Sequence, residues 1–213
     1  EITQTDENGG YSIEIRPNAA VFVIKPRNWM VPLDEHNLPQ YYYLHFENGS
    51  ASMKYGGVEA TGPIPDKVDF PLHSQQEPNQ FTVLYLGDSQ TEDLREIDWY
   101  ARDIVAELID LQHVAFGSAL GDIVNDDLSL FARINAVNAQ IGIPMFNVFG
   151  NHDMDFDAMS DPWSDDTYTS VYGPPNMIFQ YGPVHFIYLD NVLFKPAQAG
   201  ESRPSYVGGF RPD

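Results

Sequence analysis

Three Gly-Asp or Gly-Asn steps follow apolar runs in the second half of the 213-residue chain. Asp88, Asp122 and Asn151 stand in these steps, separated by 34 and 29 residues. If the preceding runs are neighbouring parallel strands, their carboxyl ends meet at one crevice, which is where α/β folds bind ligands. Converging carboxylates repel each other unless a cation neutralises them, and hard divalent cations prefer oxygen ligands. A single Gly-Asp step is more often a plain turn, but three in order predict a cation site.

The runs at 81–86, 113–120 and 144–149 predict the strands that position these residues. Between the first two, apolar residues recur at helical spacing from Leu94 to Ile109, after a Thr91 that suits a helix start. A second helix is predicted over 130–141, and two further strands over 177–181 and 185–189. Alternating strands and helices of this kind indicate an α/β domain, which we place at residues 80–213.

Residues 1–76 differ from the rest of the chain, because short β-type runs alternate with turn residues and no helical period is visible. The runs lie at 12–16, 21–25 and 40–46. This pattern predicts a small β-sandwich-like accessory domain, joined by the polar linker 73–79 to the α/β domain. Its three consecutive tyrosines, 41–43, suit packing in a sheet, or alternatively contact with a carbohydrate or a protein partner.

The composition excludes several classes of function. A net charge of −20 with only 11 Lys and Arg argues against a nucleic-acid partner, which a basic surface would attract. It favours a small phosphate substrate, or a site where bound cations invert the local potential. The chain contains no cysteine, so disulfides, thiolate zinc sites and Cys nucleophiles are excluded. No apolar run reaches the roughly 18 residues of a membrane span.

Three motifs resemble those of the calcineurin-like metallophosphoesterases: GDSQ (87–90), GDIVND (121–126) and GNHD (150–153). The usual motifs of that family are D-x-H, G-D and G-N-H-[DE], followed by a lone His and a G-H-x-H. The resemblance covers about residues 81–213 and implies a partial metallophosphoesterase α/β sandwich. It also implies a phosphoester hydrolase that uses two divalent metal ions and a metal-bridging hydroxide.

The resemblance carries over to individual positions of this chain. Asp88 would bind the first metal, Asp122 would bridge both metals, and Asn151 would bind the second through its amide oxygen. His152 would act on the phosphoryl group or protonate the leaving alkoxide. Asp153 would orient the imidazole of His152.

The chain departs from the family pattern in two ways. Gln90 stands where the family has a metal-binding His, as in a branch similar to the manganese-dependent ADP-ribose/CDP-alcohol diphosphatases. A Gln oxygen favours Mn, with Fe, Mg, Ca and Zn as other candidates. In addition, only His152 of the six histidines lies in a ligand-type loop. By the family pattern the chain therefore stops before the later His motifs, and alone it would lack ligands for full activity.

The N-terminal part carries a second resemblance, in the stretches 21–29, 34–45 and 56–72. These are similar to a small β domain that precedes some bacterial calcineurin-like phosphoesterases with export signals, which implies a periplasmic or extracellular location. No export signal is present among the 213 residues.

The substrate is expected to be a small phosphomonoester, phosphodiester or diphosphate, and the oligomeric state stays open. The alternative is a non-catalytic metal-binding module whose β domain binds a glycan or protein. A nuclease of the same superfamily is disfavoured by the charge.

Overall fold

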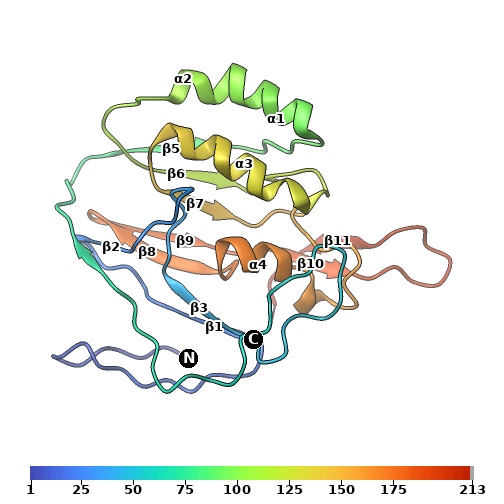
Figure 1. Cartoon of the computed structure of the whole chain (residues 1–213), viewed down its shortest axis with the longest axis horizontal. Helices are drawn as coiled ribbons and strands as arrows, with labels where there is room; N and C mark the ends of the chain where they lie inside the picture. The colour runs from blue at the N-terminus through green and yellow to red at the C-terminus, as the bar shows by residue number, and fades with distance from the viewer. Residues whose placement is uncertain (212–213) are drawn as a thin grey trace.

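The computed structural model describes residues 1–211, and its centre is a parallel sheet of three strands in the order β5-β6-β7 (Figure 1). The strands are β5 (Thr82–Leu86), β6 (Val114–Leu120) and β7 (Met145–Val148). Both pairings are parallel, and Gly117 of β6 lies opposite Leu84 of β5 and Met145 of β7. All three strands coincide with predicted runs, and the mixed α/β class is confirmed.

Helices make both crossovers of this sheet. The first consists of α1 (Leu94–Tyr100), a π-helical turn (Ala101–Val105) and α2 (Ala106–Leu108). It begins after Asp93, whose carboxylate accepts a hydrogen bond from the Glu96 N–H, rather than at Thr91. The second contains α3 (Phe131–Asn138), flanked by 3₁₀ turns at Leu128–Leu130 and Ala139–Ile141. It ends at Gly142, which has a φ of 77°; a glycine in this left-handed conformation commonly terminates a helix.

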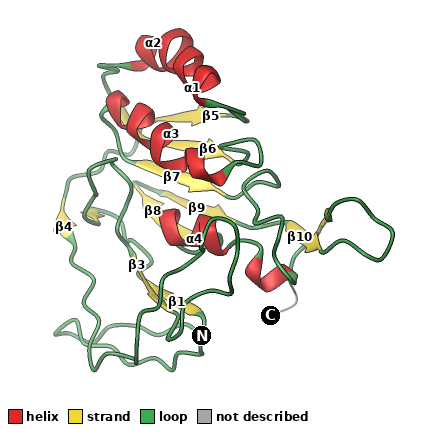
Figure 2. Ribbon diagram, turned by 45° about the vertical axis from the view of Figure 1, so that its right-hand side comes forward, coloured by secondary structure: helices red, strands yellow, loops and turns green. Residues whose placement is uncertain are grey.

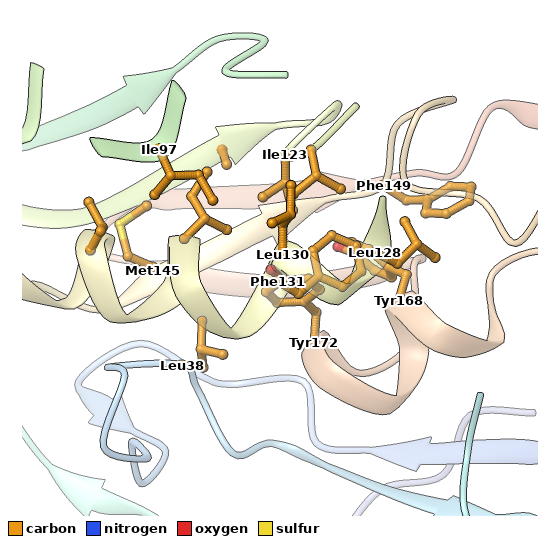
Figure 3. Packing of buried hydrophobic residues seen from close by; sticks show 14 of the residues in the cluster. Leu38, Ile97, Ile123, Leu128, Leu130, Phe131, Met145, Phe149, Tyr168 and Tyr172 are labelled. Atoms are coloured by element: carbon orange, nitrogen blue, oxygen red, sulfur yellow. The ribbon is translucent and has the colours of Figure 1, made fainter. Parts of the chain in front are cut away.

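One face of the sheet packs against these helices through a large hydrophobic cluster (Figure 3). Ile97 of α1 and Ile134 of α3 are fully buried in it, together with Ile123 and Val124 from the turn after β6. The fourth helix, α4 (Asp166–Tyr172), adds Tyr168 and Tyr172. Because Ile123 and Val124 are part of the core, packing anchors the turn that carries Asp122.

The opposite face of the sheet carries an aromatic cluster. Phe116 of β6 and Phe146 of β7 pack against Phe179 at ring-centroid distances of 5.3 and 4.1 Å. Phe179 belongs to a hairpin of β8 (Met177–Tyr181) and β9 (Val184–Tyr188), which lies next to β7 in the ribbon view (Figure 2). The hairpin therefore covers the face of the sheet that the helices leave open.

The N-terminal part consists of two short antiparallel ladders joined by long loops. β1 (Ala19–Phe22) pairs with β3 (Tyr42–His45), and β2 (Trp29–Met30) pairs with β4 (His73–Ser74). Residues 12–16 do not form the predicted strand. The neighbouring stretch 63–71 contains three prolines, which have no N–H to donate to a ladder.

Several N-terminal side chains are buried with the second half of the chain. Val31 and Tyr41 belong to the aromatic cluster, and Leu38 belongs to the helix-side cluster. Lys25 forms a β-bridge with Phe179, and its buried ammonium group contacts the equally buried carboxylate of Glu77 at 2.6 Å. The division into domains 1–76 and 80–213 stays a prediction.

The remaining elements were not predicted. They are α4, a 3₁₀ turn (Asp161–Trp163) before it, and the hairpin of β10 (Val192–Lys195) and β11 (Ser205–Gly208). Within residues 1–211, no helix combines the length and the apolar character that crossing a membrane requires.

Two buried carboxylates lie at the start of α4. Asp155 accepts hydrogen bonds from the Thr167 N–H and hydroxyl at 2.9 and 2.7 Å. Asp166 is also buried, and its Oδ2 has no hydrogen-bond partner within residues 1–211. Burial raises the pKa of each carboxyl to about 6. An unfolded Asp has a pKa of about 3.9, so the folded state holds more protons, and stability falls as the pH rises from about 4 to about 6.

We therefore expect Asp166→Asn to stabilise the protein at pH 7.5. The pKa difference corresponds to roughly 3 kcal/mol, but the amide of the new Asn is itself a buried polar group, which leaves a gain of about 1 kcal/mol. The midpoint of thermal unfolding should rise by about 2–4 °C at pH 7.5 and by less at pH 5. The exposed Glu59→Gln serves as the control and should move neither midpoint. A loss of stability at pH 7.5 would contradict this account of Asp166.

Candidate functional site

The carboxyl ends of β5, β6 and β7 lie at one edge of the sheet because the three strands are parallel and adjacent. Asp88 lies two residues after β5, Asp122 two residues after β6, and Asn151 three residues after β7. The strand order thus brings the predicted residues to the same edge, as the spacing of the Gly-Asp and Gly-Asn steps suggested.

Two glycines allow the loops after β6 and β7 to approach each other closely. A Cβ atom on Gly150 would lie 2.1 Å from the Asp122 nitrogen and 2.3 Å from its Oδ1, which is far inside van der Waals contact. Gly121 has a φ of 89°, and a Cβ atom there would lie 3.1 Å from the Gly150 Cα. These contacts place the Asn151 loop directly against Asp122.

Asp122 is the centre of this arrangement. Its Oδ1 accepts a hydrogen bond from the His152 N–H at 2.9 Å, and its carbonyl oxygen accepts one from the Gln90 N–H at 2.7 Å. Burial raises the pKa of the Asp122 carboxyl. The contacts with His152 oppose this shift, and the adjacent Asp88 carboxyl adds to it. Two carboxyls that interact in this way cost free energy unless a positive charge joins them.

The backbone is left-handed at three of the four predicted metal ligands. The φ angles are 55° at Asp88, 42° at Gln90 and 46° at Asp122. Non-glycine residues adopt this conformation uncommonly and at a cost in free energy, and such residues cluster at functional sites. The observed strain is a second reason to regard this edge as the functional part of the molecule.

His152 is held by a residue other than the predicted one. Its Nδ1 lies 2.6 Å from Oδ1 of Asp126, and its carbonyl oxygen accepts a hydrogen bond from the Asp126 N–H at 3.2 Å. Sequence reasoning gave this role to Asp153, and the contact with Asp126 corrects it. GDIVND was recognised as a motif, but nothing in the sequence alone pairs its last Asp with a His 26 residues away.

Asp153 instead joins the two loops. Its side chain is fully buried, and it accepts hydrogen bonds from the N–H groups of Ile123, Val124 and Gly150 at 2.9, 3.3 and 3.0 Å. Burial raises the pKa of this carboxyl, and the N–H donors oppose the shift. The residue therefore fixes the loop after β6 against the loop after β7, and its carboxylate faces backbone amides.

The donor set of this edge fits a hard divalent cation better than a soft one. The predicted ligands are two carboxylates, Asp88 and Asp122, and two amides, Gln90 and Asn151, all of them oxygen donors. Across the described part of the chain, no group of three or more His, Asp or Glu side chains is arranged to hold a metal ion. The predicted set contains only two such side chains, so the amides would be essential to it.

Comparison with known proteins gives one weak similarity. No family model and no curated protein sequence matches the chain. Among solved structures, the fold is similar to that of a purple acid phosphatase from the seeds of yellow lupin (Lupinus luteus), with a TM-score of 0.36 and 12% sequence identity. The match covers 80% of this chain and 36% of that chain, so the chain spans about a third of the length of the phosphatase. At this identity and TM-score, the similarity assigns no family.

Proposed function

We propose that the chain belongs to a metal-dependent hydrolase of small phosphoesters. One observation carries this proposal: Asp88 and Asp122 follow adjacent parallel strands at one edge of the sheet, both with a left-handed backbone, and the imidazole of the neighbouring His152 contacts Asp126. A carboxylate pair suits divalent cations, and a positioned imidazole suits proton transfer to or from a phosphate ester. The calcineurin-like motifs point to the same reaction.

In this proposal, Asp88, Gln90, Asp122 and Asn151 would hold the divalent cations, and their oxygen donors would favour Mn. When bound, the cations would supply an activated water and offset the charge on the phosphate oxygens. His152 would contact the phosphoryl group and serve as the proton donor. Because its Nδ1 faces Asp126, its Nε2 is the nitrogen left to donate a proton to the leaving alkoxide.

The proposal is tested by hydrolysis of para-nitrophenyl phosphate and bis(para-nitrophenyl) phosphate with Mn²⁺. We expect activity that EDTA abolishes and that Asp122→Asn lowers by at least about 10²-fold, since groups that merely orient a metal ligand are worth 10–100-fold. Asp98→Asn, an exposed carboxylate on α1, is the control. Activity that survives EDTA, or that Asp122→Asn leaves intact, would contradict the assignment. Faster hydrolysis of the monoester would indicate a phosphomonoesterase, and faster hydrolysis of the diester would indicate a phosphodiesterase.

The metal preference should change when Gln90 is replaced. Gln90→His exchanges an oxygen donor for a nitrogen donor, which suits Zn²⁺, and histidine tolerates left-handed φ better than most residues. We expect the ratio of Mn²⁺- to Zn²⁺-supported hydrolysis to fall at least severalfold in this variant. Binding constants of Mn²⁺ and Zn²⁺, measured separately for the wild type and for Gln90→His, show whether the variant is still folded and binds metal. An identical ratio in both proteins would remove Gln90 from the ligand set.

A second candidate function is supported by a cavity of about 450 Å³ in the N-terminal part. Its lining includes Tyr11 and Tyr43 beside Asp66 and Asp69. Aromatic rings with nearby carboxylates suit a carbohydrate, and the volume lies in the range of small-molecule sites. Binding of the chain to a glycan array, abolished by Tyr43→Ala, together with the absence of phosphoester hydrolysis, would favour this function over the first.

A further inference from the structure

Segment 53–57 of the N-terminal part reaches the candidate functional site. The Tyr55 hydroxyl donates a hydrogen bond to the Asp126 carbonyl oxygen at 3.2 Å. Both flanks of Tyr55 are anchored, because the Lys54 N–H donates to Asp157 at 2.7 Å and the Gly57 N–H donates to the Thr167 hydroxyl at 3.2 Å. Met53 and Tyr55 also pack against the helix-side hydrophobic cluster. The segment is thus docked by packing and by hydrogen bonds on both sides.

Tyr55 contacts the residue that holds the imidazole. Asp126 has a left-handed φ of 65°, and it contacts His152 through both its N–H and its carboxylate. A hydrogen bond to the Asp126 carbonyl fixes the orientation of the peptide that follows this strained residue. Tyr55, Asp126 and His152 therefore form a chain of contacts from the N-terminal part to the imidazole.

Lys54 brings a positive charge to the same place. Its ammonium group lies 2.5 Å from the Tyr55 hydroxyl and 4.4 Å from the centroid of the Tyr55 ring. The hydrogen bond to Tyr55, together with the nearby Asp127 and Asp157, raises the pKa of Lys54 and keeps it charged. It forms no ion pair with any of residues 1–211. In a chain with a net charge of −20, an exposed ammonium group next to Tyr55 is a natural contact for an anion.

We propose that segment 53–57 forms one wall of the active site, in which Tyr55 positions His152 through Asp126 and Lys54 contacts the phosphate group of the substrate. This inference rests on the proposed hydrolase function and gives the N-terminal part a role in it. Tyr55 is a positioning residue, because it acts through Asp126 and does not itself touch the substrate. Lys54 would set the affinity for anionic substrates.

Two substitutions separate these roles in steady-state kinetics. Tyr55→Phe should lower kcat by about 10-fold or more with little change in KM, since orienting contacts of this kind are worth 10–100-fold. Lys54→Met should raise KM for para-nitrophenyl phosphate and weaken inhibition by inorganic phosphate, and Lys54→Arg should restore both. Tyr206→Phe and Lys195→Met are the controls, because both residues are exposed on the β10–β11 hairpin.

A spectroscopic measurement keeps the test independent of turnover. The side-chain ¹⁵N shifts of His152, assigned by comparison with His152→Gln, report the bonding of its Nδ1. We expect Tyr55→Phe to change these shifts and Tyr206→Phe to leave them unchanged. Unchanged shifts in Tyr55→Phe would overturn the positioning role.

The outcomes distinguish this inference from the proposed function. If the wild type hydrolyses phosphoesters and both segment variants behave like their controls, the inference fails and the proposed function stands. If the wild type hydrolyses no ester with Mn²⁺, the proposed function fails, and the role of Lys54 fails with it. Weaker binding of inorganic phosphate to Lys54→Met, measured by calorimetry and restored in Lys54→Arg, would support the role of Lys54 directly.

Discussion

Replacing Glu77 by Gln should lower the free energy of unfolding by about 3–5 kcal/mol, because it leaves a buried ammonium group without its counter-charge. The side chains of Lys25 and Glu77 are only 2% and 0% exposed, and they meet at 2.6 Å. Glu77 also accepts hydrogen bonds from the Gly182 N–H and the Gln75 amide, and Lys25 donates to the Gln180 carbonyl at 2.7 Å. The pair therefore connects the N-terminal part to the β8–β9 hairpin.

Two comparisons make this prediction specific. Asp69→Asn removes the partner of Lys67 from an exposed ion pair and should change stability by less than about 1 kcal/mol. The double variant Lys25→Met/Glu77→Gln should lose less stability than the two single variants together, because the uncompensated charge is gone. Urea denaturation of the wild type, Glu77→Gln, Lys25→Met, the double variant and Asp69→Asn measures all of these differences. A loss of under 1 kcal/mol in Glu77→Gln would mean that the pair contributes no more than a surface pair does.

The second large effect is expected from Gly150→Ala. The added methyl group would occupy the space of the Asp122 nitrogen and carboxylate, so the loop after β7 must move away from the loop after β6. A displacement of about 1 Å at a catalytic site can cost about 10²-fold in rate. We therefore expect hydrolysis to fall by about that factor, with a loss of stability of about 1–3 kcal/mol from overpacking.

Gly87→Ala is the matched control for this substitution. Gly87 also precedes a predicted ligand at the end of a strand, but a Cβ atom there would meet no atom within 4 Å. Its activity should stay within about a factor of 3 of the wild type, since nothing has to move in the packed loops. Equal losses in the two variants would show that the closeness of the β6 and β7 loops is not what the site requires.

The sequence predicted the elements that are defined by local patterns. Strands β5, β6 and β7 are mostly apolar runs that end within two residues of a glycine, and α3 has helical spacing with a terminating Gly142, so their positions were correct to within a few residues. Helix α4 was missed because its seven residues are largely polar, and only tertiary packing buries Tyr168 and Tyr172. The expected strand at 12–16 failed because pairing depends on a partner that local sequence does not specify.

In the candidate site, too, some residues could be predicted from the sequence and others could not. Asp88, Gln90, Asp122 and Asn151 could be proposed because motifs mark them at strand ends, and their roles as metal ligands stay predictions. The contact between His152 and Asp126 depends on the exact approach of two loops, and the one between Tyr55 and Asp126 joins residues 71 positions apart. No periodicity or spacing encodes such contacts, so the structure was needed to find them.

The most direct test of the account is Mn²⁺ binding to the chain, followed by electron paramagnetic resonance or calorimetry. We predict saturable binding by the wild type, which Asp88→Asn weakens and Asp122→Asn abolishes, while replacement of the exposed Asp98 on α1 by Asn leaves binding unchanged. Binding that is equal in Asp122→Asn and the wild type, or no saturable binding to the wild type, would contradict a cation site at the carboxyl ends of β5, β6 and β7.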